Sequence, residues 1–233
     1  MKILSFILSL TLITGFFSCT KKDNYPAPGS KLTGALMYKG DSIPVEYIRV
    51  PFQLYQFGFG KVGGINETFD QDGVMHALLF DGEYKFIIPN GQGPFLWKQT
   101  VAGNPDTLLI TVNGNTTINI EVTPFYMIRN PQITGSGGNV TATFKLEQII
   151  TGAGAKAIEK VTLFINKTQF VSGSDNIKNT GISGSAITDP NNISLTVAVP
   201  SITPTQNYVF ARIGVKIAGV EDLLFSPLKK IQF

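Results

Sequence analysis

The amino-acid sequence predicts an all-β protein built from two β-sandwich domains, and three observations lead to this fold class. The 233 residues include 24 Gly and 13 Pro, and Thr, Ile and Val are frequent, which favours strands and turns. Short apolar or alternating runs recur between turn residues, while no convincing stretch of helical period follows the first 18 residues. The pattern restarts around Thr123-Pro124, so we expect one sandwich over residues 32–124 and a second over residues 125–233.

Six runs predict the strands of the first domain, at residues 32–38, 49–57, 74–80, 83–88, 108–113 and 116–122. Asp72-Gly73 predicts a turn before the strand that starts at Val74. Asn113-Gly114 predicts a tight hairpin that joins the last two strands, because this dipeptide readily adopts the positive φ angles of a two-residue turn. Asp81-Gly82 is a candidate for a third turn.

A second series of runs predicts the strands of the second domain, at residues 125–133, 139–147, 160–166, 193–199, 208–217 and 228–233. In the second of these runs apolar residues alternate with Thr and charged residues, as in a sheet with one solvated face. The segment 175–192 is rich in Gly, Ser and Asn. It is expected to form a surface loop or an irregular edge, because it has few apolar residues to offset the entropy of ordering.

Cys19, the only cysteine of the chain, follows Lys2, an apolar run over residues 3–17 and the small residue Ser18. This order is typical of a bacterial lipoprotein signal peptide, here residues 1–18, with Cys19 as the lipidated first residue of the mature chain. The apolar run is shorter than the roughly 20 residues of a membrane span, so anchoring is expected rather than spanning. Residues 19–31 then predict a lipidated tether. The alternative is an ordinary secretory signal with a cysteine there by chance.

Charge and cysteine content exclude several classes of protein. Without residues 1–18 the chain has 18 basic and 16 acidic residues, with no block of like charge. A nucleic-acid partner would favour a clustered basic stripe, so none is expected. A lipidated Cys19 leaves no cysteine for a disulfide.

The ordered motifs of the chain resemble a Bacteroidetes lipoprotein family catalogued as a domain of unknown function. They run from the cysteine and Asp23-Asn24-Tyr25 through Leu32-Thr33-Gly34, the 72–84 region and Gly93-Pro94-Phe95 to residues 122–125. The resemblance implies a carboxypeptidase regulatory-like, transthyretin-like sandwich followed by an immunoglobulin or fibronectin III-like one. It also implies an association with glycan-import systems of the starch-utilisation type, although fold alone does not fix function.

Candidate catalytic groups are few, so no enzyme, cofactor or metal site is expected. The single histidine, His76, lies in a predicted strand whose neighbours Met75, Ala77 and Leu79 face the core, and no elbow motif surrounds a serine. Asp70-Gln71-Asp72-Gly73 resembles the start of a calcium loop but lacks the downstream Glu, so a turn is favoured. Paired carboxylates for glycoside cleavage stay formally open among Glu46, Glu67, Asp70, Asp72 and Glu83.

Aromatic residues give the better indication of a ligand, because flat rings stack on the apolar faces of sugars. Trp97 and Phe95 lie in the Gly- and Pro-containing stretch 90–98, which could hold them at the surface. Tyr55, Phe57 and Phe59 form a second set, whose two-residue spacing places them on one face of a strand. The alternative for Trp97 is a place in the core, where a single Trp of a small sandwich often lies.

These observations predict a non-catalytic outer-membrane lipoprotein at the cell surface that binds polysaccharide or assists glycan import, with a transporter complex as a possible partner. Two alternatives stay open. In one, the sandwiches contact an outer-membrane transporter without binding sugar; in the other, two carboxylates face each other in the cleft of a hydrolase. Glycan binding predicts an exposed platform at Trp97, whereas the protein-contact alternative predicts that Trp97 is buried.

Overall fold

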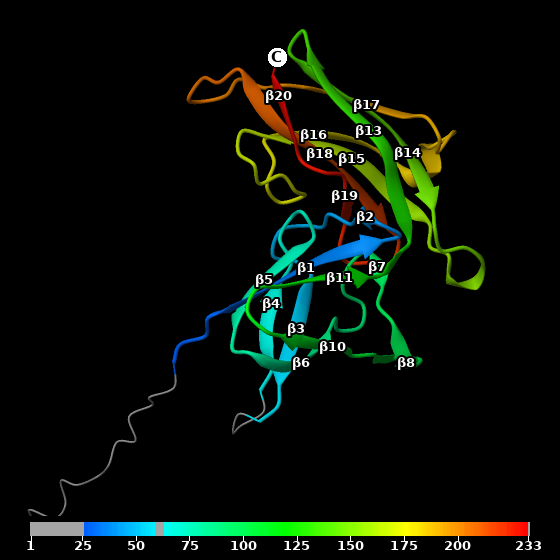
Figure 1. Ribbon diagram of the computed structural model, residues 1–233. Coiled ribbons are helices and arrows are strands. Elements are labelled where there is room, and N and C mark those ends of the chain that lie inside the picture. Colours follow the sequence, from blue (N-terminus) through cyan, green and yellow to red (C-terminus); the bar gives the residue numbers. More distant parts are fainter. Residues whose placement is uncertain (1–25, 59–62, 233) are drawn as a thin grey trace, which may run out of the picture.

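The computed structural model describes residues 26–58 and 63–232, and strands make up nearly all of the regular secondary structure in this part of the chain (Figure 1). The predicted signal peptide, Cys19 and Phe59 lie outside the described residues. No helix of the described part has the length and apolar character needed to cross a membrane. The prediction of an all-β protein with two β-sandwich domains is confirmed.

The first sandwich holds two four-stranded sheets. One has the order β11-β1-β2, with β5 also paired to β1, on the edge opposite β11, and the other has the order β10-β6-β3-β4. Strands β1 and β11 are parallel, whereas the other pairs are antiparallel. Its strands are Ser30–Tyr38 (β1), Asp41–Ser42 (β2), Pro51–Gln56 (β3), Ile65–Thr68 (β4), Val74–Leu79 (β5), Gly82–Ile87 (β6), Phe95–Leu96 (β7), Gln99–Val101 (β8), Asn104–Pro105 (β9), Leu108–Val112 (β10), Thr116–Glu121 (β11) and Thr123–Pro124 (β12).

The second sandwich is antiparallel throughout, with one sheet of order β13-β14-β17 and one of order β16-β15-β18-β19, in which β20 also pairs with β18. Its strands are Tyr126–Ser136 (β13), Asn139–Gln148 (β14), Ile158–Asn166 (β15), Lys178–Ser183 (β16), Ile193–Ala198 (β17), Tyr208–Ile217 (β18), Leu224–Phe225 (β19) and Lys229–Gln232 (β20). Two single 3₁₀ turns, Gly152–Gly154 and Gly184–Ala186, complete it. Two packed antiparallel sheets are the arrangement of an immunoglobulin-like sandwich.

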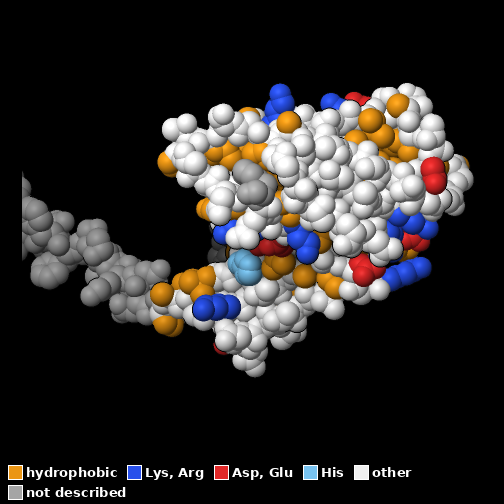
Figure 2. Space-filling view, turned by 90° about the horizontal axis from the view of Figure 1, so that it is seen from above, with side chains coloured by type: hydrophobic (Ala, Val, Ile, Leu, Met, Phe, Trp, Pro, Cys, Tyr) orange, Lys and Arg blue, Asp and Glu red, His pale blue; other side chains and the backbone are white. Residues whose placement is uncertain are grey.

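Side-chain alternation along the strands builds both cores, because residues two apart share one face of a strand. In β14 the predicted set Val140, Ala142, Phe144 and Leu146 is buried, and β17 alternates in the same way. The described surface carries charges of both signs, and on the face drawn in Figure 2 they are scattered rather than gathered.

The predicted hairpin at Asn113-Gly114 is wrong. Strand β10 pairs with β6 and strand β11 pairs with β1, so the chain crosses here from one sheet of the first sandwich to the other. Gly114 does have the positive φ expected of this dipeptide, at 63°, but its amide donates to the Asp81 carboxylate instead of closing a ladder. The local turn signal was correct, while the pairing was decided by where each strand buries its apolar face.

Two segments contain more strand than their composition suggested. Ser30 and Lys31, assigned to the tether, already pair with β5, and the Ser30 hydroxyl donates to Asp81. Within the segment 175–192, residues Lys178–Ser183 form the edge strand β16 on β15. Main-chain pairing with a buried neighbour supplies the stabilisation that the side chains of this segment do not.

A buried arginine and a continuous apolar core join the two sandwiches. Arg212, on β18, is fully buried and donates to the Ser226 carbonyl of its own domain and to the carbonyls of Val45 and Gln71 of the first domain, at 3.0, 3.2 and 2.8 Å. Its guanidinium lies 4.4 Å from the centre of the Phe225 ring. Burial lowers the pKa of Arg212 to about 10, against the opposing effect of Asp72, Glu46 and Asp70.

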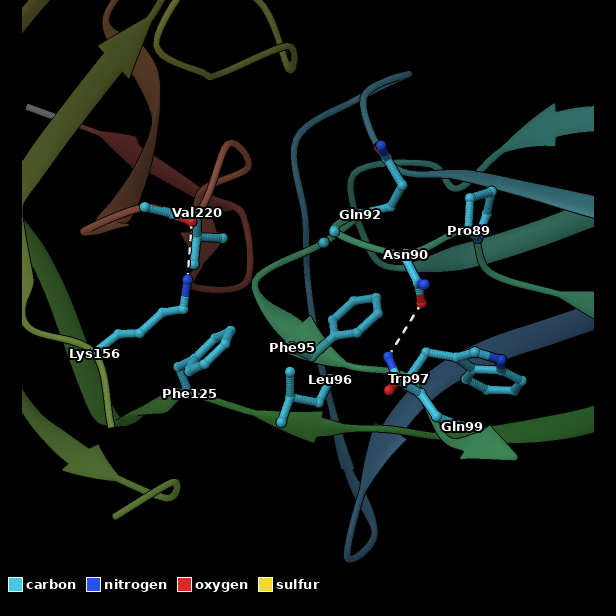
Figure 3. Close-up of a pocket in the computed structure, with 13 residues that line it drawn as sticks. Pro89, Asn90, Gln92, Phe95, Leu96, Trp97, Gln99, Phe125, Lys156 and Val220 are labelled. Carbon is cyan, nitrogen blue, oxygen red and sulfur yellow. Dashed lines mark hydrogen bonds between the residues drawn. The ribbon is translucent and has the colours of Figure 1, made fainter. Parts of the chain in front are cut away.

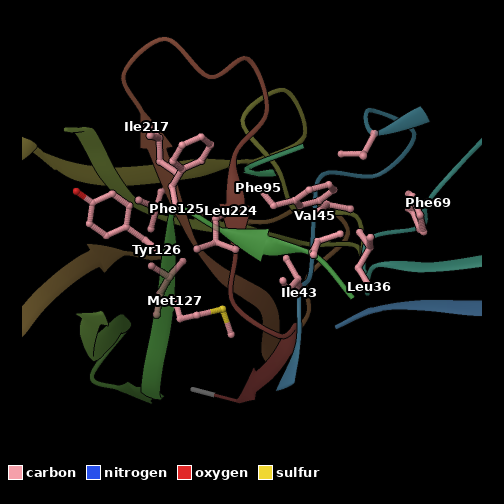
Figure 4. Close-up of a cluster of buried hydrophobic side chains, with 14 of the residues drawn as sticks. Leu36, Ile43, Val45, Phe69, Phe95, Phe125, Tyr126, Met127, Ile217 and Leu224 are labelled. Carbon is pink, nitrogen blue, oxygen red and sulfur yellow. The ribbon is translucent and has the colours of Figure 1, made fainter. Parts of the chain in front are cut away.

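Apolar side chains from both domains meet around this contact. A single cluster of buried residues runs from the first sandwich into the second, and Figure 4 shows its residues on both sides of the boundary: Leu36, Ile43, Val45, Phe69, Phe95, Phe125, Tyr126, Met127, Ile217 and Leu224. The amide of Phe225 also donates to the carbonyl of Pro44 at 3.1 Å. The two sandwiches therefore pack as one unit.

Candidate functional site

A small pocket lies at the boundary between the two sandwiches, and it contains two of the residues that the sequence singled out (Figure 3). Its volume is about 130 Å³. Most of the lining comes from the segment between β6 and β8, and the second domain closes one side. The lining residues are Pro89, Asn90, Gly91, Gln92, Gly93, Phe95, Leu96, Trp97, Gln99, Phe125, Lys156, Gly219 and Val220.

Trp97 is buried, with 6% of its surface exposed, so the expectation of an exposed platform at this residue is wrong. Its indole Nε1 donates to the carbonyl of Asp106 at 2.7 Å, and its ring meets Phe86 edge-on with centroids 5.7 Å apart. The Gly and Pro residues around it form a loop as expected, but that loop folds over the core. A buried Trp97 is the outcome that the protein-contact alternative predicted.

Phe95 is also buried, and the backbone of Gly93 makes room for its ring. Gly93 has a φ of 78°, and a Cβ at this position would overlap the Phe95 ring. The Gly93 amide donates to the Asp222 carboxylate of the second domain at 2.7 Å. Glycine at this position therefore permits both the ring packing and a hydrogen bond between the domains.

Leu96, between these two aromatics, is 47% exposed and gives the pocket an apolar surface that solvent reaches. Pocket residues on either side are polar. The Gln99 Nε2 donates to the Asn90 Oδ1 at 3.1 Å, and the Gln99 Oε1 accepts from the Gly103 amide at 3.1 Å, which fixes both amide groups. The side-chain amide of Gln92 has no hydrogen-bond partner among the described residues, so it is free to bond to a ligand.

Lys156 brings a positive charge to the side of the pocket formed by the second domain. Its ammonium donates to the carbonyl of Gly219 at 2.9 Å and lies 5.3 Å from the centre of the Phe125 ring. An ammonium has three donors, so two remain for a ligand. The pocket thus combines apolar surface with amide and ammonium donors.

The second predicted aromatic set does not join this pocket. Tyr55, on β3, is half-buried and donates from its hydroxyl to the Gln53 Oε1 at 3.0 Å, and Phe57 is exposed beside Lys85, whose Nζ is 4.7 Å from the ring centre. Phe59 lies outside the described residues, so the stripe of three stays a prediction. Neither Tyr55 nor Phe57 lines the pocket.

Sequence reasoning missed two parts of the pocket: the polar residues Asn90, Gln92 and Gln99, and the residues that the second domain contributes. The Gly and Pro residues of the stretch 90–98 predict a loop, and its Asn and Gln residues are the signal that points to sugar-binding amides. Phe125, Lys156 and Val220 carried no signal, because their place in the pocket depends on how the domains pack.

The other candidate groups lie elsewhere. His76 is an exposed strand residue whose Nε2 is 3.7 Å from Asp70, and its neighbours Met75 and Leu79 are buried as expected. Asp70 accepts from the amides of Asp72 and Val74, both at 2.9 Å, which builds the predicted turn. Within residues 26–58 and 63–232, no three His, Cys, Asp or Glu side chains gather as metal ligands.

Asp222 gives the interdomain contact beside the pocket a dependence on pH. Burial raises the pKa of its carboxyl, against the opposing hydrogen bond from Gly93. A raised pKa means that the folded chain holds the proton more tightly than the unfolded chain. The contribution of Asp222 to stability is therefore greatest below its unfolded pKa and falls as pH rises through the folded value.

We expect Asp222→Asn to remove the fall in folding stability that Asp222 causes as pH rises. The Asn side chain keeps an oxygen that accepts from the Gly93 amide, but it carries no buried charge. The variant should exceed the unmodified chain in free energy of unfolding at pH 7, and the difference should shrink as pH falls to 4. Urea denaturation across this range measures it. A difference that stays constant with pH would show that Asp222 does not titrate in this way.

The fold and the site define a protein of two β-sandwiches packed around an interdomain pocket. The family described as a protein of unknown function (DUF3823), N-terminal domain, matches residues 30–123, and its C-terminal domain of unknown function matches residues 126–230. The chain belongs to this DUF3823 family.

Solved structures of the family are similar over almost the whole chain. A DUF3823 family protein from Parabacteroides merdae shares 32% identity over 89% of this chain and 100% of its own, with a TM-score of 0.75. One from Bacteroides ovatus shares 25% identity over 87% and 98%, with a TM-score of 0.76. A Bacteroides uniformis protein described as a candidate carbohydrate-binding protein shares 15% identity over 88% and 100%, with a TM-score of 0.67. No curated protein matches the chain.

Proposed function

We propose that this protein is a non-catalytic glycan-binding lipoprotein of the outer membrane, exposed at the cell surface, and that the interdomain pocket binds one sugar ring of a polysaccharide. The observation that carries the proposal is the pocket itself, in which the exposed side chain of Leu96 lies between the amides of Asn90, Gln92 and Gln99 and the ammonium of Lys156. Sugar sites need such a mixture, because a pyranose has an apolar face and a polar rim of hydroxyls. The carbohydrate-binding description of the Bacteroides uniformis relative adds support to the ligand class.

The size of the pocket decides what it can take. At about 130 Å³ it is smaller than the roughly 300–1,000 Å³ of pockets that enclose a drug-sized ligand. It suits the end or a branch of a glycan chain rather than an enclosed oligosaccharide. Capture of chains for a neighbouring import receptor requires no more than this.

The anchor and the accessory role rest on the sequence and on the family resemblance. Lys2, the apolar run and Cys19 supply a lipoprotein signal, and an acylated Cys19 would hold the pocket at the membrane surface. Metabolic labelling with a radioactive or alkyne-bearing fatty acid tests this step. Label should appear on the full chain and be lost in Cys19→Ala.

Trp97 is the only tryptophan and lines the pocket, so its fluorescence reports occupancy directly. The chain from Lys21 onward keeps all of the described strands. It is titrated with plant, host and microbial polysaccharides, and retardation in polysaccharide-containing native gels is followed alongside. A saturable change with one glycan supports the proposal. Trp97→Phe should lose the optical signal and keep the retardation.

Gln92→Ala is the sharpest test of the pocket, because the side chain has no hydrogen bond to lose within residues 26–58 and 63–232. We expect affinity for the glycan to fall about fivefold, the equivalent of one hydrogen bond of about 1 kcal/mol, with unchanged thermal stability. Leu96→Ala should weaken binding similarly. Leu109→Ala removes a Leu that is still more exposed and lies on β10, away from the pocket, and serves as the matched control.

The protein-contact alternative retains one observation in its favour, the burial of Trp97. It predicts that no glycan changes the fluorescence or retards the chain, while Leu96→Ala weakens association with an outer-membrane transporter. These two results together would overturn the glycan proposal and support the protein-contact alternative.

A further inference from the structure

An exposed aromatic pair lies where a loop of each sandwich meets the other. Tyr47, in the turn before β3, and Phe170, in the loop after β15, have ring centroids 5.0 Å apart and planes inclined by 50°. They are 43% and 40% exposed, and the adjoining Ile48 is 61% exposed. We name Tyr47, Ile48 and Phe170 the aromatic shelf; none of the three lines the interdomain pocket.

We propose that the aromatic shelf is a second glycan-contact site, which stacks the apolar face of a pyranose within a polysaccharide chain. The inference rests on the proposed function for its ligand class and adds a site to it. Tilted aromatic rings in solvent offer a surface for the C–H face of a sugar, as a buried Trp97 cannot.

The backbone holds the first half of the shelf in an unfavourable conformation. The amide of Arg49 donates to the carbonyl of Glu46 at 3.3 Å, which closes a turn with Tyr47 and Ile48 at its centre. Ile48 has a φ of 54°, in the region that a turn of this kind normally gives to glycine. A β-branched residue with this φ is strained, and such strain persists mainly at functional sites. The turn keeps an apolar side chain where a glycine would relieve the strain.

Buried polar contacts fix the second half of the shelf. The Asn166 side chain, which is buried, donates to the carbonyls of Phe170 and Asp175 at 2.6 and 3.3 Å. Val171 is buried beside Phe225, so the residue next to Phe170 is anchored. The loop therefore presents the Phe170 ring without needing a ligand to order it, which lowers the entropic cost of binding.

Interdomain contacts set the position of one half relative to the other. The Ser174 hydroxyl lies 3.5 Å from the buried Glu46 carboxylate, and Arg212 holds the Val45 carbonyl directly before the turn. Both rings are thus placed by the same packing that locks the sandwiches together.

The dimensions and rim of the shelf favour a glycan over a protein partner. A stable protein interface buries about 1,200–2,000 Å² and centres on a larger apolar core than three side chains. Polar residues adjoin both halves of the shelf. Arg49 directly follows Ile48 in the turn, and Ser174, which bonds to Asp175, lies 3.5 Å from Glu46 at the start of that turn. One sugar ring fits a surface of this size.

A second contact point explains how a small pocket can retain a long chain. Two weak sites that engage one polymer act at a high effective concentration, so their combined affinity exceeds that of either. A short oligosaccharide that fills only the pocket gains nothing from the shelf. Dependence on chain length therefore distinguishes the two sites.

The test uses the chain from Lys21 onward, with the polysaccharide that retards it and a di- or trisaccharide of the same glycan. Tyr47→Ala and Phe170→Ala should each weaken retardation by the polysaccharide about tenfold, the equivalent of a stacking contact of about 1.4 kcal/mol, and leave the Trp97 response to the short sugar unchanged. Tyr47→Phe and Phe170→Tyr keep a ring and should bind normally. Leu109→Ala is again the matched control.

A chemical readout covers the case in which an Ala variant unfolds. The chain from Lys21 has no cysteine, so Phe170→Cys gives a single thiol, whose alkylation the polysaccharide should slow at least fivefold. Unchanged retardation in the Ala variants together with unprotected Cys alkylation would overturn the shelf and leave the pocket proposal standing. No polysaccharide binding by the unmodified chain would overturn both.

Discussion

Replacing Arg212 by Met is expected to lower the free energy of unfolding by about 4 kcal/mol, more than any exposed substitution in the chain. The change strips the donors from three carbonyls, those of Ser226, Val45 and Gln71, and each buried acceptor left without a donor costs about 1–3 kcal/mol. Relief of the desolvated charge offsets part of this loss, because the pKa of Arg212, lowered to about 10, shows that its charged form is costly to bury.

Thermal denaturation and calorimetry measure the result. A loss of 4 kcal/mol in a chain of this size corresponds to a fall in Tm of about 10 °C. Two of the three carbonyls belong to the first domain, so the substitution also weakens the contact between the domains. The thermal unfolding of the variant should therefore show two transitions, one for each domain, in place of a single cooperative one. Arg212→Lys should not rescue it, since one ammonium cannot reach three carbonyls in the way a planar guanidinium does.

Arg129→Met is the matched control, because Arg129 also joins the domains but at the surface. It pairs with Asp41 of the first sandwich and Glu147 of the second, and these carboxylates raise its pKa. Pairs this exposed contribute about 0–1 kcal/mol. Equal losses in the two variants would show that burial of the Arg212 contact does not matter.

Replacing Gly73 by Ala is expected to cost about 3 kcal/mol, the second-largest effect. Gly73 has a φ of 74°, and a Cβ there would overlap the backbone carbonyl oxygen of Ile43. Backbone cannot yield as a side chain can, so the 70–73 turn must shift, and it carries the Gln71 carbonyl that Arg212 binds. A positive φ alone costs about 1–2 kcal/mol for a residue with a Cβ, and the clash adds to it.

Gly138→Ala isolates the contribution of the dihedral angle. Gly138 has a φ of 75°, nearly that of Gly73, but no atom lies within 4 Å of the position its Cβ would take. Urea denaturation of both variants should give about 1 kcal/mol for Gly138 and about 3 kcal/mol for Gly73. If the two losses are equal, the turn accommodates the methyl group and the predicted clash is absent.

The locked boundary between the sandwiches has a functional consequence. Both the interdomain pocket and the aromatic shelf draw residues from the two domains, so each depends on a fixed relative position. Contacts such as Arg212 to Val45 and Asp222 to Gly93 supply that position before any ligand arrives. A preorganised site loses less entropy on binding, which matters most for the weak, multivalent contacts of a polysaccharide.

The sequence by itself determined the fold class and twelve of the twenty described strands, including every strand of seven or more residues, while it missed short strands such as β2 and β4 and the edge strand β16. Alternation such as that of β14 specifies which face is buried, because the two-residue period of a strand leaves no other way to hide the apolar side chains. The Asp72-Gly73 turn was equally legible, since the requirement for a positive φ is local. The aromatics of the 90–98 stretch also pointed to the segment that lines the pocket.

Only the tertiary structure decided which strands pair, which aromatics are exposed and what completes each site. Asn113-Gly114 carries a hairpin signal, yet its two flanking strands join different sheets. Trp97 is buried while Tyr47 and Phe170, more than 120 positions apart, meet in solvent. Such outcomes depend on non-local packing: local sequence fixes the conformation of a turn or strand, whereas exposure and contact are set by what the rest of the chain places against it.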